Sequence, residues 1–448
     1  MTSYQSKHLL IKTYGCQMNV YDTEIMWRLL TPLGYQASSS EKQADIILIN
    51  TCAIREKAEQ KVFSYLGRLA LIKRHKPNLI IGVCGCIAQN QGKKLIHRAP
   101  CVNFVVGTHA IFQLPSILEN ILNGNKQNVY VSFQDHLNEI NMQQSPIIDS
   151  SISGFVTIMR GCNNYCAYCV VPYVRGKEMS RSADSIITEI KHKVSKGMRE
   201  VTLLGQNVNS YGRHENQLSF TDLLEAVNDI DGLLRIRFTT SHPKDFGTEL
   251  INAFAQLDKL CLHIHLPVQS GSDQILKRMN RKYTRKDYLT KIELLKNKCP
   301  DISITSDFIV GFPGESHSDF CDTLSLIKAV EYDNLFAFQY SDRNIAPSSK
   351  FFPKVEETVK RDRLIELLDV QNKNTLKNND RCVGQRYSVL VEGKSKRDNK
   401  QWTGRTSGNK IVNFVAPETT KPLDAKLVDV VIEEACAHSL RGYLCHKK

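Results

Sequence analysis

Three cysteines near the middle of the sequence are close enough together to hold one metal centre. Cys162, Cys166 and Cys169, the loop cysteines, form a C-x3-C-x2-C pattern directly after the apolar run 155–159. A structural zinc site closes its shell with four protein ligands, but no further His or Cys follows until His192. A cubane iron–sulfur cluster uses one thiolate per iron, so three cysteines leave one iron open. The pattern favours such a cluster, and zinc with a distant fourth ligand is the alternative.

A second set of three cysteines is spread over the N-terminal part of the chain. Cys16, Cys52 and Cys86, the N-terminal cysteines, stand 36 and 34 residues apart, and each follows a short apolar segment. If these segments are parallel strands, their carboxyl ends share one edge of a sheet, and the three thiols meet there. We therefore predict a second three-thiolate site. Cys84 lies inside its apolar segment, where a free cysteine behaves as a small hydrophobic residue, so we choose Cys86 as the ligand and leave Cys84 as a core residue or a reserve thiol.

Both sets of cysteines resemble those of known enzymes. The loop 161–169, with Tyr168 before its last cysteine, resembles the cluster loop of the radical S-adenosylmethionine (SAM) enzymes. In that family the open iron binds SAM, one-electron reduction yields a 5′-deoxyadenosyl radical, and the aromatic residue lies near the adenine. Together with this loop, the segments 15–19, 50–52 and 85–86 resemble the methylthiotransferase family, most of all its tRNA-modifying branch. The resemblance covers nearly the whole chain.

This resemblance implies two 4Fe–4S clusters, each held by three cysteines, and SAM as the cofactor. The cluster on the loop cysteines would generate the radical that attacks carbon 2 of N6-isopentenyladenosine, which is adenosine-37 beside the anticodon of tRNA. The cluster on the N-terminal cysteines would deliver the sulfur, methylated by a second SAM, and the two open irons would face one another. An electron donor such as flavodoxin or ferredoxin is also implied.

Alternating strand and helix patterns predict the elements that hold these residues, and the fold class is α/β. We predict an N-terminal parallel-sheet domain over residues 8–123, a linker over 124–151, a partial (β/α)6 radical SAM barrel over 152–378 and a small TRAM-like β-barrel over 381–446. Strands of the first domain are expected at 8–13, 45–50, 79–83 and 104–106. Strands of the partial barrel are expected at 155–159, 201–204, 234–238, 261–266, 302–310 and 335–340.

Polar residues and glycines follow the predicted strands of the partial barrel, where functional residues of such barrels belong. Glycine lets a ligand approach the backbone, and amides and hydroxyls give uncharged hydrogen bonds to a zwitterion and a ribose. His263 and His265 alternate along one strand; no carboxylate is apparent nearby, so we expect a hydrogen-bonded interior rather than a metal site. Besides Tyr168, the residues predicted to bind SAM are Gly205, Gln206, Asn207, Ser241, Gln269 and Gly311.

The C-terminal segment 381–448 is basic, with 13 Lys or Arg against 7 Asp or Glu. The run 394–397 followed by Trp402 and Arg405 suits phosphate contacts and stacking on an unpaired base, and a solvated basic loop is the alternative. The position and pattern of this segment, with its closing stretch 438–442, resemble the TRAM domain, an RNA-binding module. We therefore expect tRNA as the macromolecular partner.

The composition of the 448-residue chain fits a cytoplasmic enzyme. No run of 18 apolar residues occurs, the first seven residues are polar, and 14 cysteines in a cytosolic chain indicate metal or redox chemistry rather than disulfides. We expect a monomer that does not bind membranes. Two other functions remain open: a methylthiotransferase for threonylcarbamoyl-adenosine in tRNA or for a ribosomal-protein aspartate, and a non-catalytic RNA-binding protein with two zinc sites.

Overall fold

The computed structural model describes residues 7–52, 56–124, 128–134, 151–213, 218–417 and 421–445. Within these ranges the chain forms two compact units. The first consists of residues up to 149 together with 157–163 and 169–192, and the second consists of 150–156, 164–168 and 193–448.

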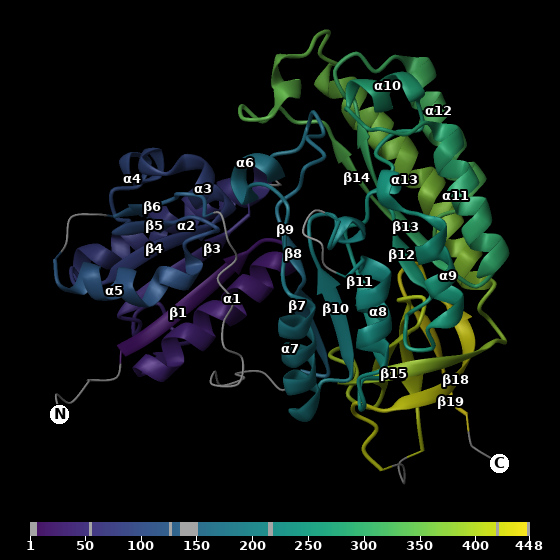
Figure 1. The fold of residues 1–448 in the computed structure, drawn as a ribbon, viewed down its shortest axis with the longest axis horizontal. Helices are drawn as coiled ribbons and strands as arrows, with labels where there is room; N and C mark the ends of the chain where they lie inside the picture. The colour runs from purple at the N-terminus through teal and green to yellow at the C-terminus, as the bar shows by residue number, and fades with distance from the viewer. Residues whose placement is uncertain are drawn as a thin grey trace. The chain divides into compact units, whose positions relative to one another are not determined.

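A six-stranded parallel sheet forms the centre of the first unit (Figure 1). Every residue of β3 is buried, as expected of an apolar strand that is covered on both faces. The sequence does not predict the short edge strands β2 and β6. Strand β6 lies inside the predicted linker, of which residues 125–127 and 135–150 are outside the described residues. The order of the strands is β2 (Tyr35–Ala37), β1 (Lys7–Tyr14), β3 (Ile46–Thr51), β4 (Ile80–Gly85), β5 (Phe104–Val106) and β6 (Val129–Tyr130).

Helices pack on this sheet through their apolar faces. The core includes Val62, Leu66 and Leu69 of α2, at helical spacing, together with Ile47 and Ile49 of β3. A short antiparallel pair, β8 with β9, also belongs to the first unit. The remaining elements of this unit are α1 (Gln17–Leu30), η1 (Thr31–Leu33), α2 (Glu56–His75), α3 (Cys86–Gln91), α4 (Lys93–Arg98), η2 (Ile111–Gln113), α5 (Leu114–Leu122), β8 (Met159–Arg160), α6 (Val171–Arg175), β9 (Met179–Ser180) and α7 (Ala183–Ser195).

Six parallel strands of the partial barrel form two three-stranded sheets, with the orders β11-β10-β7 and β12-β13-β14. A parallel bridge between Ile236 and Leu260 connects the two sheets. The prediction of a partial (β/α)6 barrel is therefore confirmed. The strands are β7 (Ser153–Thr157), β10 (Glu200–Leu204), β11 (Arg235–Phe238), β12 (His263–His265), β13 (Ser303–Val310) and β14 (Asn334–Gln339).

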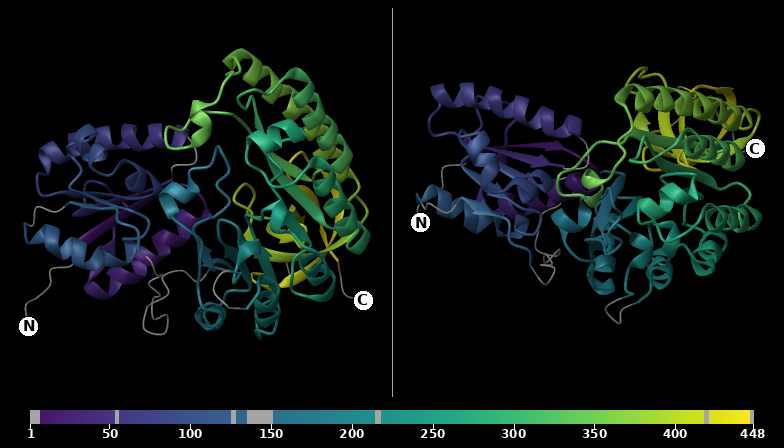
Figure 2. Two further views of the ribbon diagram at one scale, coloured as in Figure 1. Left: turned by 45° about the horizontal axis from the view of Figure 1, so that its top comes forward. Right: turned by 90° about the horizontal axis from the view of Figure 1, so that it is seen from above.

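Helices alternate with these strands, and α13 packs along β13 and β14 (Figure 2). Serine or threonine caps begin several of them: Ser219, Thr284 and Ser316 each accept a hydrogen bond from the backbone N–H three residues later. The helical elements are η3 (Val208–Ser210), α8 (Phe220–Asn228), η4 (Pro243–Asp245), α9 (Thr248–Gln256), α10 (Asp273–Arg278), α11 (Arg285–Lys298), α12 (His317–Val330), η5 (Pro347–Lys350) and α13 (Glu357–Asp380).

A closed five-stranded barrel ends the second unit, which confirms the predicted small β-barrel. Arg235 and Arg237 of β11 donate to backbone carbonyls of this barrel, those of Ser388 and Thr406 among them, at 2.9 and 2.8 Å. The barrel is therefore anchored at the amino ends of the parallel strands. Its strands are β15 (Arg386–Lys394), β16 (Trp402–Thr406), β17 (Ile411–Val415), β19 (Leu440–Leu444) and β18 (Leu427–Ala435), of which the sequence does not predict β19 as a strand.

Gly82 in β4 is needed for the packing of the N-terminal sheet. A Cβ atom at this position would lie 2.4 Å from Cζ of Phe104 and 2.9 Å from Cδ2 of Leu48. We expect Gly82→Ala to destabilise the protein by about 1–3 kcal/mol because the core is overpacked. Gly67→Ala, on the exposed side of α2 where no described atom lies within 4 Å, should instead stabilise it by up to about 1 kcal/mol. Urea unfolding of the full chain measures both, and a neutral Gly82→Ala would contradict the packing argument.

Candidate functional site

The register of three neighbouring strands brings the N-terminal cysteines to one edge of the six-stranded sheet. Tyr14 of β1 lies opposite Thr51 of β3, and Thr51 lies opposite Gly85 of β4. The three strands therefore end at the same level, and one of the N-terminal cysteines follows each strand end within two residues. This edge is the place where α/β folds bind ligands.

The thiols at this edge interact with one another and with one arginine. A hydrogen bond from Cys52 lowers the pKa of Cys16 to about 6, and the charge of Arg175 acts in the same direction against the effect of burial. Burial raises the pKa of Cys86, and Arg175 opposes this rise. Cys16 is thus a thiolate at neutral pH, and the charge of Arg175 favours the thiolate of Cys86. Such a donor set fits a thiolate-bound cluster.

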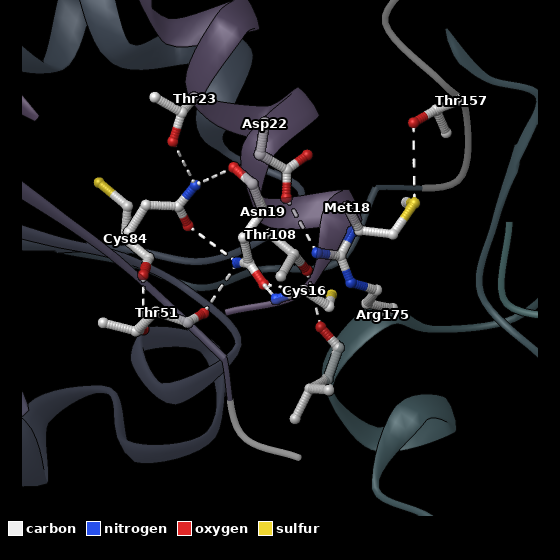
Figure 3. Close-up of polar contacts among 12 residues, drawn as sticks. Cys16, Met18, Asn19, Asp22, Thr23, Thr51, Cys84, Thr108, Thr157 and Arg175 are labelled. Atoms are coloured by element: carbon white, nitrogen blue, oxygen red, sulfur yellow. Dashed lines mark hydrogen bonds and ion pairs between the residues drawn. The ribbon is translucent and has the colours of Figure 1, made fainter. Parts of the chain in front are cut away.

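A buried amide pair fixes the loops that carry Cys16 and Cys52 (Figure 3). Asn19 donates through Nδ2 to Oδ1 of Asn50 and to the carbonyl of Thr51, both at 3.0 Å, and its Oδ1 accepts from the backbone N–H of Cys16. Asn50 donates in return to the carbonyl of Asn19 at 2.8 Å. Helix α1 is therefore tied to the end of β3, so the two cysteines keep a fixed separation.

Cys84 lies within β4 and not at its end. Its side chain is fully buried, and burial raises the pKa of its thiol. Its carbonyl accepts a hydrogen bond from Oγ1 of Thr51 at 2.6 Å, which joins β4 to β3. Cys84 thus has the properties of a core residue, and Cys86 remains the proposed ligand.

The loop cysteines lie between β8 and α6. Gly161 precedes them with φ +82°, and a Cβ there would lie 1.8 Å from the carbonyl oxygen of Lys177, so only glycine fits. The backbone N–H of Cys162 donates to the carbonyl of Gly176 at 3.2 Å. Sγ of Cys169 accepts from the first backbone N–H of α6 at 3.5 Å. A sulfur that accepts such a hydrogen bond is suited to carry the negative charge of a thiolate.

Cys166 lies beside a buried arginine and a neutral histidine. Nη1 of Arg281 lies 3.5 Å from Sγ of Cys166 and 3.4 Å from the hydroxyl of Tyr168. Nε2 of His242 lies 3.9 Å from the same sulfur. Burial and the charge of Arg281 lower the pKa of His242 to about 2, so this imidazole stays neutral. Although burial lowers the pKa of Arg281, the groups around it, Tyr168 first among them, raise it well above its ordinary value.

Unpaired polar atoms mark part of the rim that we predict to bind SAM. Ser241 and Asn209 follow β11 and β10, and both are buried. Oγ of Ser241 and both side-chain polar atoms of Asn209 have no hydrogen-bond partner in the described parts of the chain. Buried polar groups are normally paired, so these atoms fit a polar ligand such as SAM. The sequence indicates Asn209 only through its place in the segment 205–209.

Other predicted rim residues shape the backbone instead. Nδ2 of Asn207 donates to Ser210 and Asp245, and its Oδ1 accepts from the backbone N–H of His242, so this amide is already engaged. Gln269 has φ +77°, in the region that favours glycine, a strained conformation often found at functional sites.

The remaining predicted rim residues are glycines and one glutamine. Gly311 has φ +70°, and a Cβ there would lie 2.3 Å from Cγ of Lys360. Gly205 is buried and Gln206 half-buried, directly after β10.

The two histidines of β12 form the predicted hydrogen-bonded interior. Nε2 of His263 and Nδ1 of His265 both contact Oγ1 of Thr305, at 3.2 and 3.0 Å. The expectation that no carboxylate lies nearby is wrong, since Oδ1 of Asp307 lies 3.5 Å from Nε2 of His265. Asp307 comes from β13, 42 residues further along the chain, which is why the local sequence does not reveal it.

The predicted role of Trp402 in base stacking is wrong. Its indole is 7% exposed and belongs to the core of the C-terminal barrel, and the ammonium group of Lys394 lies 3.9 Å from the ring centroid. Arg405 donates to Glu392 at 2.9 Å. The exposed cations of the segment 394–400 are Lys394, Lys396, Arg397 and Lys400, which suit phosphates rather than bases.

Among the described residues, no three His, Cys, Asp or Glu side chains form a group that could hold a single metal ion. This does not count against iron–sulfur clusters, because each cysteine of a cubane cluster binds a different iron and the sulfurs stand further apart.

Comparisons with known proteins agree with this arrangement. Family models match residues 8–107 (Uncharacterized protein family UPF0004), 156–327 (Radical SAM superfamily) and 380–445 (TRAM domain). A protein of Desulfosudis oleivorans is 50% identical, with 97% of this chain and 96% of the relative covered. One of Syntrophus aciditrophicus is 49% identical, covering 98% and 95%. Both are named tRNA-2-methylthio-N(6)-dimethylallyladenosine synthase. This chain belongs to that synthase family. It is a radical SAM methylthiotransferase.

Solved structures share the fold at low sequence identity. The radical SAM methyltransferase TsrM of Kitasatospora setae matches with a TM-score of 0.58 and 13% identity over 77% of each chain. The cobalamin-dependent radical SAM enzyme OxsB matches with a TM-score of 0.52, over 82% of this chain and 56% of that one. These two matches concern the fold alone. None of the described helices has the length and apolar character needed to cross a membrane.

In the iron-free protein, Cys16 should be alkylated by iodoacetamide with a midpoint near pH 6. The thiolate is the nucleophile, and the pKa of Cys16 is lowered to about 6, whereas an ordinary thiol titrates near about 8.5. The alkylation rate of Cys16 should therefore reach its plateau at a pH where ordinary cysteines are still mostly protonated and react slowly. Cys52→Ala removes the hydrogen bond that lowers this pKa most and should move the midpoint upwards. Mass spectrometry of the Cys16 peptide measures both, and equal midpoints in the two proteins would refute the assignment.

Proposed function

We propose that this chain methylthiolates N6-isopentenyladenosine at position 37 of tRNA, beside the anticodon, to give 2-methylthio-N6-isopentenyladenosine. The relatives at about half identity carry the name of this activity. What carries the proposal is the convergence of the N-terminal cysteines at one sheet edge. A radical SAM enzyme needs one cluster to make its radical, and a second three-thiolate site gives the sulfur a place to be held.

The residues present fit two 4Fe–4S clusters and SAM. When bound, these groups would supply the one-electron chemistry that breaks the C–H bond at carbon 2, and the sulfur and methyl that replace the hydrogen. The loop cysteines would hold one cluster and the N-terminal cysteines the other, each set offering three thiolates to four irons.

The side chains around these sites have distinct tasks. Arg281, held above its ordinary pKa, would stabilise the thiolate of Cys166 and orient Tyr168. Ser241 and Asn209 would give hydrogen bonds to the polar groups of SAM, because their side-chain atoms are buried and unpaired among the described residues. His242 stays neutral, and its Nδ1 accepts from the backbone N–H of Lys244, so its Nε2 would donate its hydrogen towards the sulfur of Cys166.

The proposed macromolecular partner is tRNA. The match to the TRAM domain and the exposed Lys396, Arg397 and Lys400 support contacts to its phosphates. Such contacts make binding weaker as salt rises. We further propose a cytoplasmic monomer that receives electrons from a small donor such as flavodoxin or ferredoxin.

The iron content of cysteine variants tests the two proposed sites. The reconstituted full chain should contain about eight irons with equal sulfide, and substitution of either cysteine set by alanine should leave about four. Cys84→Ala should keep all of them, because Cys84 is a buried core residue. Iron and sulfide analysis with Mössbauer spectroscopy measures this. Zinc without sulfide would contradict the proposal. Loss of four irons in Cys84→Ala would show that Cys84, and not Cys86, is the ligand.

Nucleoside analysis tests the substrate. In a strain that lacks the gene, tRNA should accumulate N6-isopentenyladenosine and contain no 2-methylthio derivative. The wild-type gene and its Cys84→Ala variant should restore the derivative, and the Cys86→Ala variant should not. If threonylcarbamoyl-adenosine loses its methylthio group instead, the substrate is that nucleoside. If no tRNA nucleoside changes, the proposed substrate class is wrong.

A further inference from the structure

A buried ion pair lies in the same unit as the N-terminal cysteines. Nη2 of Arg175, the last residue of α6, donates to Oδ2 of Asp22 on α1 at 2.9 Å. The two side chains are 3% and 5% exposed. Burying such a pair is unfavourable unless the remaining donors and acceptors also find partners.

One nitrogen of Arg175 has no hydrogen-bond partner among the described residues. Nη1 is buried and makes no hydrogen bond with the described residues. Figure 3 shows the guanidinium next to Asp22, with the thiol of Cys16 on its other side. The thiolates of Cys86 and Cys16 interact with its charge, as Asp22 does, and Cys86 is near enough for direct contact with Arg175. The charge of Arg175 thus acts on these cysteines, and Nη1 keeps an N–H that none of the described residues accepts.

The backbone that carries Arg175 is held firmly. Oγ1 of Thr108 donates to the carbonyl of Val174 at 2.7 Å, and Nε2 of His109 is hydrogen-bonded to the carbonyl of Arg175 at 2.9 Å. The next residue, Gly176, has φ +78°. Thr108 and His109 follow β5, so the same sheet that positions the cysteines also positions the arginine.

We propose that Arg175 is a positioning residue of the second cluster site: it compensates the negative charge at Cys16, Cys52 and Cys86 and directs Nη1 towards the sulfur bound there. This role depends on the proposed function, because it requires a cluster on the N-terminal cysteines. Asp22 orients the guanidinium and cancels part of its charge. Net charge and hydrogen bonds to sulfur set the reduction potential of an iron–sulfur cluster. Removing Arg175 should therefore lower the potential of this cluster, and removing the charge of Asp22 should raise it.

The test uses the full chain with Cys162, Cys166 and Cys169 changed to alanine, so that only the N-terminal cysteines can hold a cluster. Reduction potentials are measured by a titration followed by electron paramagnetic resonance. Relative to this parent, Arg175→Met should shift the potential down and Asp22→Asn should shift it up, while Arg175→Lys, which keeps the charge, should lie between Arg175→Met and the parent. A purely structural role would disturb the cluster in the same direction in both cases.

Two further variants make the outcome unambiguous. Glu189→Gln removes a buried carboxylate that pairs with Arg181 in the same unit and should leave the potential unchanged. If Arg175→Met fails to fold because it leaves the Asp22 carboxylate buried without its partner, the double variant Asp22→Asn/Arg175→Met removes both charges. Its potential should lie below that of Asp22→Asn. Equal or same-sign shifts in a parent that holds about four irons would overturn the role of Arg175 alone. A parent without iron would overturn both this role and the proposed function.

Discussion

Three thiols from distant parts of a chain can share one inorganic centre only if the backbone delivers them to the same place. In this protein the parallel register of β1, β3 and β4 does so. Neighbouring strands lie about 4.8 Å apart, so the two outer strands of the three are roughly 10 Å apart, within reach of cysteine side chains around a cube of iron and sulfur. A shift of register by one residue would turn every side chain of a strand to the other face. In β3 such a shift would turn Asn50, whose amide pairs with Asn19, onto the face where Ile47 and Ile49 pack in the apolar core, so the packing opposes it.

Charge is the second constraint, since thiolates gathered in a buried place repel one another. Each of the two cysteine sets has one buried arginine whose positive charge opposes this repulsion. Arg281 beside Cys166 donates to neutral groups, among them the hydroxyl of Tyr283 and the carbonyl of Pro267. Arg175 is held by the carboxylate of Asp22. The two sites therefore receive different net charge: a full positive charge lies beside Cys166, and a partly cancelled one beside the N-terminal cysteines. Centres of the same composition would have different potentials in these surroundings.

The sequence predicts the parts of this fold that depend on local patterns. Long apolar runs give the strands that end at the cysteines, and the spacing of the cysteines gives the two sites. Strands β2 and β6 are missed because two or three residues carry no periodicity. Asp22 and Arg175 are missed because their pairing joins residues 153 positions apart. The burial of Trp402 is missed because the sequence of β16 shows no apolar alternation; in the structure Trp402, Gly404 and Thr406 are buried and alternate with more exposed residues.

The inward position of Trp402 also fits the placement of the C-terminal barrel in the second unit. Arg235 and Arg237 attach this barrel near the amino ends of the parallel strands, whereas Ser241 and Asn209 lie beyond the carboxyl ends. Strand β10 has five residues, so at about 3.3 Å per residue roughly 16 Å separates its two ends. The attachment of the barrel therefore lies at the end of the strands opposite to the rim. In the proposed complex with tRNA, the exposed cations of the barrel would contact phosphates, and the rim would face the reacting base.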